Sequence, residues 1–372
     1  MFYLAFKNMR IGLLSFHKNY NYGWNLQCYA LMRVLESLGH NVVLIDKRKF
    51  GDIPKYYKFK LFLSIIFDVL GINKGHLYYK RKEKEINRRI ETFYTEYLVP
   101  RSCIVKQKED YSKLEKFDTL VVGSDQVWRE KLVSPITDYF FAFVDYNANL
   151  ISYAASFGVD GCEYSQDAID QCGMLIKRFK AVSVREQAGV KLIQNVYKWH
   201  CPNPVVVPDP TLLLNLEDYC KLCNFIPHED GGLFCYILDK DEDKMKCVEK
   251  ISREVNLKQN VLFANINNVK PSVEEWIARF RDAKFVFTDS FHGCVFSLIF
   301  RKPFVAYGNK SRGLSRFTSL LDSFCQSKRI IRNSGDLTSN LLKELSMIDC
   351  KLLDQKQNYL REIGLRYLTN SL

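Results

Sequence analysis

A carboxylate, a hydroxyl and an imidazole lie within four residues of this chain. Asp289, Ser290 and His292 follow a predicted buried strand at 284–287 and precede the apolar run 294–300. The pattern predicts a sharp turn from a strand into a helix. The free N–H groups and the dipole at a helix start attract anions, and a histidine there can hold a phosphate or transfer a proton. Because Asp and Ser are also ordinary helix-capping residues, the turn alone supports a structural role equally well.

Four other apolar segments that predict strands deliver polar residues to their carboxyl ends. In an open α/β sheet this edge is where ligands bind, so the polar residues are expected to gather there. The segments are 10–16, 119–122, 181–184 and 205–207. The candidate site then contains Asn21, Asn25, Ser124, Asp125, Arg185, Asp209, Asp289, Ser290 and His292.

Two loops of different character follow predicted strands. The polar loop 19–25 precedes a helix that we expect to begin at Leu26, and the basic loop 309–316 follows a strand that ends at Tyr307. Four cations supply enough charge for a doubly or triply charged phosphate ester, and arginine suits bidentate binding of such a group. They are Arg185, Lys310, Arg312 and Arg316.

Asp209 and His292 are the natural acid–base pair of this set. They belong to different halves of the chain, so they can face each other across a cleft. Asp209 also has a structural explanation, because it stands between Pro208 and Pro210 and can initiate a turn. The chain has no Walker A, G-x-G-x-x-G or G-x-S-x-G sequence, which argues against a P-loop enzyme, a dinucleotide oxidoreductase and a serine hydrolase.

The elements around these residues alternate between strand and helix, which predicts an α/β fold. The length of 372 residues suggests two domains. We expect two Rossmann-like domains that face each other across a cleft, a GT-B-like architecture. Their expected bounds are 9–225, with a basic insertion at about 52–92, and 232–349, followed by a C-terminal helix at 350–372.

The twelve cysteines are scattered along the chain rather than arranged in a disulfide framework. With no signal peptide evident at the start, we expect reduced thiols and a cytoplasmic protein. Cys220 and Cys223 form a C-x-x-C sequence in a polar stretch, 220–232, that we interpret as the linker between the domains. No second pair and no histidine at zinc spacing accompany them, so we expect no metal site.

Positive charge is concentrated in one segment. The chain has a net charge of +12, and residues 55–89 contribute ten Lys or Arg against three Asp or Glu. The apolar run 61–72 within this segment is shorter than the about 20 residues needed to span a bilayer. Two interpretations are equally well supported: a helix lying on an anionic membrane surface, or a solvated helical hairpin packed on its own domain. No nucleic-acid-binding motif accompanies the charge, so we expect no nucleic acid partner.

Six motifs occur in a specific order and spacing over about residues 10–325, apart from the basic insertion. They are N-Y-G-W-N-L-Q-C-Y-A-L (21–31), V-V-G-S-D-Q-V-W (121–128), S-Y-A-A-S-F-G (152–158), S-V-R-E (183–186), P-D-P-T-L-L-L (208–214) and T-D-S-F-H-G (288–293). Together they resemble the polysaccharide pyruvyl transferase family.

The resemblance implies a GT-B-like enzyme that moves the pyruvate group of phosphoenolpyruvate onto two hydroxyls of a sugar as a ketal, in capsular or exopolysaccharide biosynthesis. It implies a lipid-linked sugar acceptor on the N-terminal domain and phosphoenolpyruvate on the C-terminal domain, with no cofactor and no metal ion. Contact of the basic segment 55–89 with the inner face of the cytoplasmic membrane would suit such an acceptor.

The resemblance also implies roles for individual residues. His292 would be the general acid and Asp209 the carboxylate that accepts the sugar proton, or the reverse. The family's usual turn reads R-L-H, whereas this chain has Ser290-Phe291-His292, so Lys310, Arg312 or Arg316 is expected to replace the arginine's charge. The implied phosphoenolpyruvate-binding residues are Arg185, Ser290, His292, Lys310, Arg312, Arg316 and Ser124. The implied acceptor-binding residues are Asn21, Tyr22, Asn25, Gln27 and Asp125.

Two other functions fit the same residues. A glycosyltransferase of this architecture would bind a nucleotide sugar and use the cationic loop to contact its diphosphate. A non-catalytic protein would bind anionic glycans, or an assembly partner at the membrane, without phosphate release. Fold alone does not separate these functions.

Overall fold

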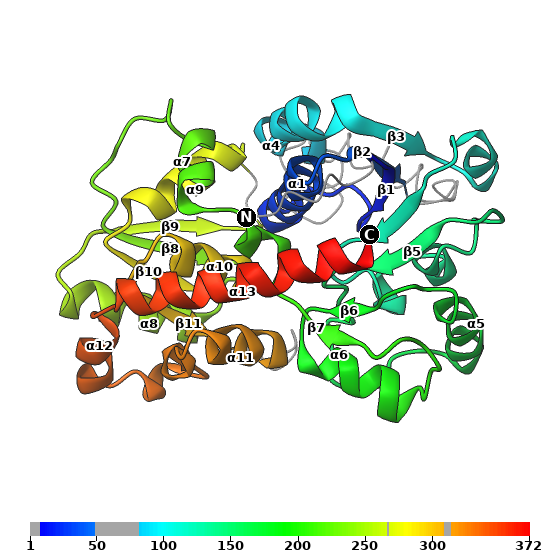
Figure 1. The fold of residues 1–372 in the computed structure, drawn as a ribbon. Helices are drawn as coiled ribbons and strands as arrows, with labels where there is room; N and C mark the ends of the chain where they lie inside the picture. The colour runs from blue at the N-terminus through cyan, green and yellow to red at the C-terminus, as the bar shows by residue number, and fades with distance from the viewer. Residues whose placement is uncertain (1–7, 49–81, 266–267, 309–313) are drawn as a thin grey trace, which may run out of the picture.

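The computed structural model describes residues 8–48, 82–265, 268–308 and 314–372. Figure 1 shows two α/β halves side by side, with the last helix running across both. Each half is built on a five-stranded parallel sheet, so the expected pair of Rossmann-like units is confirmed. Most of the basic segment 55–89 lies outside the described residues.

The N-terminal half contains a sheet of strand order β3-β2-β1-β4-β5 and a short parallel pair, β6-β7. Its strands are β1 (Arg10–Leu14), β2 (Asn41–Lys47), β3 (Ser102–Val105), β4 (Thr119–Val122), β5 (Asn149–Ser152), β6 (Ser183–Val184) and β7 (Val205–Val206). The helices α1 (Tyr22–Ser37), α4 (Arg88–Phe93), α5 (Gln166–Ile176) and α6 (Gln187–Lys191) precede β7 in the chain, and α7 (Leu216–Leu222) follows it.

The C-terminal half contains a sheet of strand order β12-β11-β10-β8-β9. Its strands are β8 (Leu233–Ile237), β9 (Gln259–Phe263), β10 (Phe285–Thr288), β11 (Phe304–Tyr307) and β12 (Ile330–Ile331). Its helices are α8 (Glu242–Glu254), α9 (Val273–Asp282), α10 (Phe291–Ile299), α11 (Leu314–Ser323), α12 (Ser339–Leu345) and α13 (Cys350–Ser371). β10, at the centre of this sheet, is buried over its whole length and leads directly into α10.

The region between the halves differs from the sequence prediction in two ways. The predicted linker 220–232 begins inside α7, which a capping box of Asn215 and Asp218 starts upstream. α7 packs against α9, so the chain has already reached the C-terminal half before residue 220. The segment predicted as an apolar strand at 205–207 forms only the two-residue strand β7, whose valines are exposed.

The first turn of α1 ties the two halves together. The ring of Tyr22 stacks on Trp276 of α9 with a centroid distance of 5.2 Å and an interplanar angle of 10°. The Tyr22 hydroxyl donates a hydrogen bond of 2.8 Å to the carbonyl of Pro271. Both rings are buried, so this contact fixes the start of α1 against the C-terminal half.

The C-terminal helix α13 joins the halves a second time (Figure 1). Near its start, Asp354 pairs with Arg301 at 2.6 Å in the C-terminal half. Near its end, the Tyr367 hydroxyl donates to the carbonyl of Ser152 at 2.8 Å in the N-terminal half. Gly364 lies so close to Tyr153 that a Cβ there would be 2.5 Å from the tyrosine hydroxyl. The helix therefore packs directly behind the strand ends that carry the site.

No helix in the described part of the chain combines the length and the apolar character that crossing a bilayer requires.

Candidate active site

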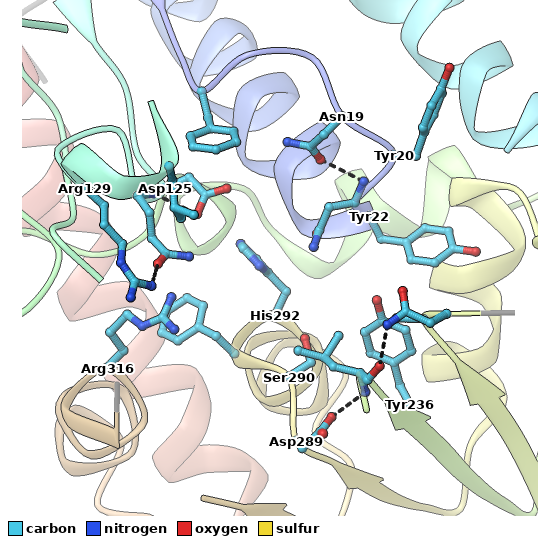
Figure 2. Close-up of a pocket in the computed structure, with 18 of the residues that line it drawn as sticks. Asn19, Tyr20, Tyr22, Asp125, Arg129, Tyr236, Asp289, Ser290, His292 and Arg316 are labelled. Carbon is cyan, nitrogen blue, oxygen red and sulfur yellow. Dashed lines mark hydrogen bonds between the residues drawn. The ribbon is translucent and has the colours of Figure 1, made fainter. Parts of the chain in front are cut away.

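A cavity of about 560 Å³ lies between the two halves and is lined by residues of both. Figure 2 shows His292 near its centre, with Asp125, Arg129 and Arg316 on one side. Tyr22 and Tyr236 lie on the other side. The predicted residues that line this cavity are Asn21, Tyr22, Asp125, Arg185, Asp289, Ser290, His292 and Arg316.

The turn between β10 and α10 has the form that the sequence predicts. Ser290 caps α10, because its hydroxyl accepts a hydrogen bond of 3.3 Å from the backbone N–H of Gly293. Asp289 faces away from the helix and accepts 2.7 Å and 2.6 Å hydrogen bonds from the Lys244 ammonium and the Leu238 N–H. These contacts fix the turn on the C-terminal sheet, and His292 projects from it toward the other half.

His292 meets Asp209 across the interface between the halves. Nε2 of His292 lies 3.7 Å from Oδ2 of Asp209, an ion-pair distance that is too long for a hydrogen bond. The same carboxylate oxygen accepts hydrogen bonds of 2.8 Å from Arg185 and 3.2 Å from the Ser124 hydroxyl. The other oxygen accepts from the hydroxyl and N–H of Thr211 at 2.7 and 3.1 Å. Every contact except that with His292 comes from the N-terminal half.

The electrostatics of this group keep Asp209 ionised. Its side chain is 0% exposed, and burial alone would raise its pKa. His292, Arg185 and Thr211 outweigh burial and hold the pKa of Asp209 well below its usual range. Burial likewise disfavours the charge of Arg185, but Asp209 and Glu186 raise the pKa of Arg185 above its ordinary value. The buried ion pair is therefore charged at neutral pH.

Arg185 and Arg316 supply positive charge to the cavity wall. The guanidinium carbon of Arg185 lies 4.4 Å from the ring centroid of Phe291, so the aromatic ring supports the cation from one side. Burial, together with repulsion from Arg185, lowers the pKa of Arg316 to about 10, which still leaves it charged at neutral pH. Lys310 and Arg312, the other predicted anion ligands, lie outside the described residues.

Ser124 and Asp209 lie behind the cavity rather than on its wall. Both are buried, and the Ser124 hydroxyl is engaged by Asp209. The strand-end pattern predicts their proximity but not their depth, because the residues after β4 and β7 turn inward and pack under the site. Ser124 therefore does not line the cavity, where a direct contact with phosphoenolpyruvate was expected.

Asn25 and Gln27 are also placed away from the cavity. The Asn21 side chain caps a helix that begins at Tyr22, four residues earlier than the sequence suggests. Asn25 and Gln27 consequently sit on a buried face of α1, where their amides donate to the Asn21 carbonyl at 3.0 Å and to the Ser15 hydroxyl at 2.9 Å. Tyr22 borders the cavity, but its ring and hydroxyl are committed to the contact with Trp276 and Pro271 described above. Asn25 and Gln27 therefore do not line the cavity, where acceptor contacts were expected, whereas Tyr22 does.

Several cavity residues carry no signal that sequence reasoning detected. Gln126 and Arg129 lie in and just after the V-V-G-S-D-Q-V-W motif, yet the spacing alone does not single them out. Tyr236 is the fourth residue of β8 in an apolar run, and Lys270 precedes α9. In the described ranges, no cluster of three or more His, Cys, Asp or Glu side chains is placed to hold a metal ion.

The fold and the position of the site define a class of protein. Two solved structures are similar along nearly their whole length, each with a TM-score of 0.50. One is an alpha-glucosyltransferase in complex with UDP and DNA, 11% identical, with 95% of this chain and 94% of that chain covered. The other is the UDP-GlcNAc 2-epimerase of Neisseria meningitidis, 7% identical, with 98% and 99% covered. These likenesses show the GT-B fold alone.

The family follows from the sequence. The family model for polysaccharide pyruvyl transferase matches residues 21–311. The chain therefore belongs to the polysaccharide pyruvyl transferase family, as the motifs indicate. No curated protein matches the chain at the sequence level.

Gly23 offers a direct test of how closely the halves must approach. A Cβ at this position would overlap the imidazole ring of His292. We therefore expect Gly23→Ala to displace the ring and lower kcat/KM by about 100-fold, the typical effect of a misplacement near 1 Å. Gly161→Ala is the matched control, because a Cβ there meets no atom within 4 Å. Activity of the Gly23 variant within a few-fold of wild type would contradict the geometry.

The ionised state of Asp209 predicts a pH-dependent contribution to stability. Its folded pKa is depressed, so its stabilising effect is present above about pH 4, the unfolded pKa, and is lost as the pH falls toward the folded value. Asp209→Asn should lower the free energy of unfolding by about 3 kcal/mol at pH 7. Urea unfolding of both proteins should show this difference shrinking in the acid range. A difference that does not change with pH would contradict an ionised Asp209.

Proposed function

We propose that this protein transfers the pyruvate group of phosphoenolpyruvate onto two hydroxyls of a sugar as a cyclic ketal, in capsular or exopolysaccharide biosynthesis. The observation that carries the proposal is the contact of His292 with the buried Asp209, beside a cavity lined by Arg185 and Arg316. Membership of the polysaccharide pyruvyl transferase family supports the same reaction.

In this proposal His292 is the general acid. Its Nε2 faces the anionic Asp209, which holds the ring in place beside the cavity. The absence of a side chain at Gly23 lets the imidazole pack closely against the start of α1. A proton from His292 to the methylene carbon of phosphoenolpyruvate would make C2 electrophilic, and Arg185 and Arg316 would bind the carboxylate and phosphate.

Asp125 is better placed than Asp209 to receive the sugar proton. Asp209 is buried, whereas Asp125 lies on the cavity wall. Asp125 also adopts a left-handed backbone with φ of 77°, a conformation that non-glycine residues seldom adopt and that clusters at functional sites. We therefore assign Asp125 as the base and Asp209 as the residue that positions His292.

The reaction balances without an added reactant. The first sugar hydroxyl adds to C2, and phosphate leaves with the electrons of the C2–O bond. The second hydroxyl then adds to C2 and closes the ketal. Of the two hydroxyl protons, one replaces the proton that His292 gave to carbon, and the other leaves with phosphate. The proposed steps therefore need only proton transfer and anion binding.

The acceptor would enter from the N-terminal half. Phe16, Asn19 and Tyr20 line that side of the cavity, and aromatic faces with amide groups suit a sugar. The chain leaves the described part of the structure after Arg48, and soon after it resumes, Glu83 lines the cavity. The described end of the basic segment therefore lies beside the site, which supports a lipid-linked acceptor presented at the inner membrane face.

The activity is tested by phosphate release from phosphoenolpyruvate with a panel of lipid-linked oligosaccharides, with product masses recorded. We expect acceptor-dependent phosphate and a mass gain of one pyruvate less one water. His292→Asn should lower turnover by about 100-fold to 10,000-fold, the range for loss of a general acid. No phosphate with any acceptor, together with thermal stabilisation by a nucleotide sugar, would favour glycosyl transfer. Binding of glycans without phosphate release would favour the non-catalytic function.

Membrane contact is tested by charge reversal. Lys55, Lys58 and Lys60 to Glu should weaken co-sedimentation with anionic liposomes by at least about tenfold, since each cation near such a surface contributes about 1 kcal/mol. The control reverses the charge of three exposed lysines elsewhere: Lys113, Lys221 and Lys328. Equal binding by both triple variants and by wild type would contradict a specific membrane contact of the basic segment.

A further inference from the structure

We infer that Gln126 is a donor-binding residue of this cavity, whose amide NH2 group donates a hydrogen bond to an oxygen of the phosphoenolpyruvate carboxylate or phosphate. The inference rests on the proposed function and adds a residue that the motif pattern does not assign. Three observations carry it: the orientation of the Gln126 amide, the contacts of Arg129 and Gly158 that fix this orientation, and the arginines that line the same cavity.

The orientation of the Gln126 amide is fixed by its neighbour. Nη1 of Arg129 lies 2.9 Å from the amide oxygen of Gln126. A guanidinium can only donate hydrogen bonds, so the atom that faces it must be the oxygen, and the NH2 group lies on the other side. Gln126 lines the cavity, and none of the described residues accepts a hydrogen bond from its NH2 group.

Arg129 is itself held from behind. Its Nε and Nη2 donate to the two carboxylate oxygens of Glu163 at 2.9 and 3.2 Å. This pairing lowers the pKa of Glu163, and Lys131 lies 3.2 Å from the same carboxylate. Because Glu163 neutralises Arg129, we assign Arg129 to positioning the amide rather than to binding the anion directly.

Gly158 completes the support. Its φ of 72° lies in the left-handed region, where glycine is favoured. A Cβ at this position would overlap the side-chain amide of Gln126. The glycine therefore lets the amide pack flat against the backbone, which limits the conformations that Gln126 can adopt.

The charge around the amide indicates an anionic ligand. Arg129, Arg185 and Arg316 line the same cavity as Gln126. Figure 2 shows Arg129 and Arg316 on the same side of His292. An N–H donor that shares the cavity wall with Arg316 and Arg185 suits an oxyanion, and the resulting hydrogen bond is charge-assisted.

The test measures phosphoenolpyruvate binding by calorimetry without acceptor, and then KM and kcat. Gln126→Glu keeps the shape of the side chain but replaces the NH2 donor with a carboxylate oxygen, and Gln126→Leu removes the amide. We expect the Kd for phosphoenolpyruvate to rise by about 10-fold to 100-fold in both, the usual effect of losing a hydrogen bond to a charged group. Gln166→Glu controls for added charge on an exposed glutamine.

Arg129→Met tests whether Arg129 holds the Gln126 amide in its orientation. It should raise the Kd and KM less than Gln126→Leu does, and it should add little when combined with Gln126→Leu, because it acts through the amide. Thermal melting checks that each variant is folded.

The outcomes separate this inference from the proposed function. If wild type binds phosphoenolpyruvate and both Gln126 variants bind it equally well, the inference is wrong and the function stands. If wild type binds only a nucleotide sugar, and Gln126→Glu weakens that binding, the anion-binding role stands and the donor is wrong. If wild type binds only a nucleotide sugar and the variants do not change it, both are wrong.

Discussion

The buried carboxylate of Asp209 is the interaction on which the site depends. It accepts hydrogen bonds from Arg185, Ser124 and Thr211 in its own half and faces His292 from the other. A charge at this depth is stable only with such compensation, since burial alone would neutralise it. The hydrogen bonds that stabilise the buried charge of Asp209 also hold this carboxylate in a fixed position next to His292. Structure and proposed catalysis therefore depend on one contact between the halves.

Two further features maintain the spacing that this contact requires. Tyr22 is stacked on Trp276, and Gly23 leaves no side chain between α1 and the imidazole. Behind the site, α13 extends over both halves and packs Gly364 against Tyr153. The start of α1 and the C-terminal helix thus act from opposite ends of the chain. Both hold the contact between His292 and Asp209 in place without lending a side chain to that contact.

The sequence predicts the architecture and the central pair, but not the depth of the residues around it. Apolar strands followed by polar residues are a local signal, and they correctly bring Asp209, Arg185 and His292 together. Burial depends on packing between distant segments, which is why Asn25 and Gln27 were expected on the cavity wall and instead face the interior. Helix α1 starts early because the Asn21 side chain caps it, and this moves both amides onto the buried face. The motif pattern does not single out Gln126 for a related reason: its orientation depends on Arg129 and Glu163, and Glu163 is distant in sequence.

The most direct test of the account is a double-mutant cycle between Asp209 and His292, measured as the rate of phosphate release from phosphoenolpyruvate with a saturating acceptor. If Asp209 acts by positioning His292, Asp209→Asn should lower the rate strongly in wild type and change it little in the His292→Gln background. Effects that multiply in the double variant would show that the two residues act independently. That result would contradict the assignment of Asp209 as the positioning partner of the general acid.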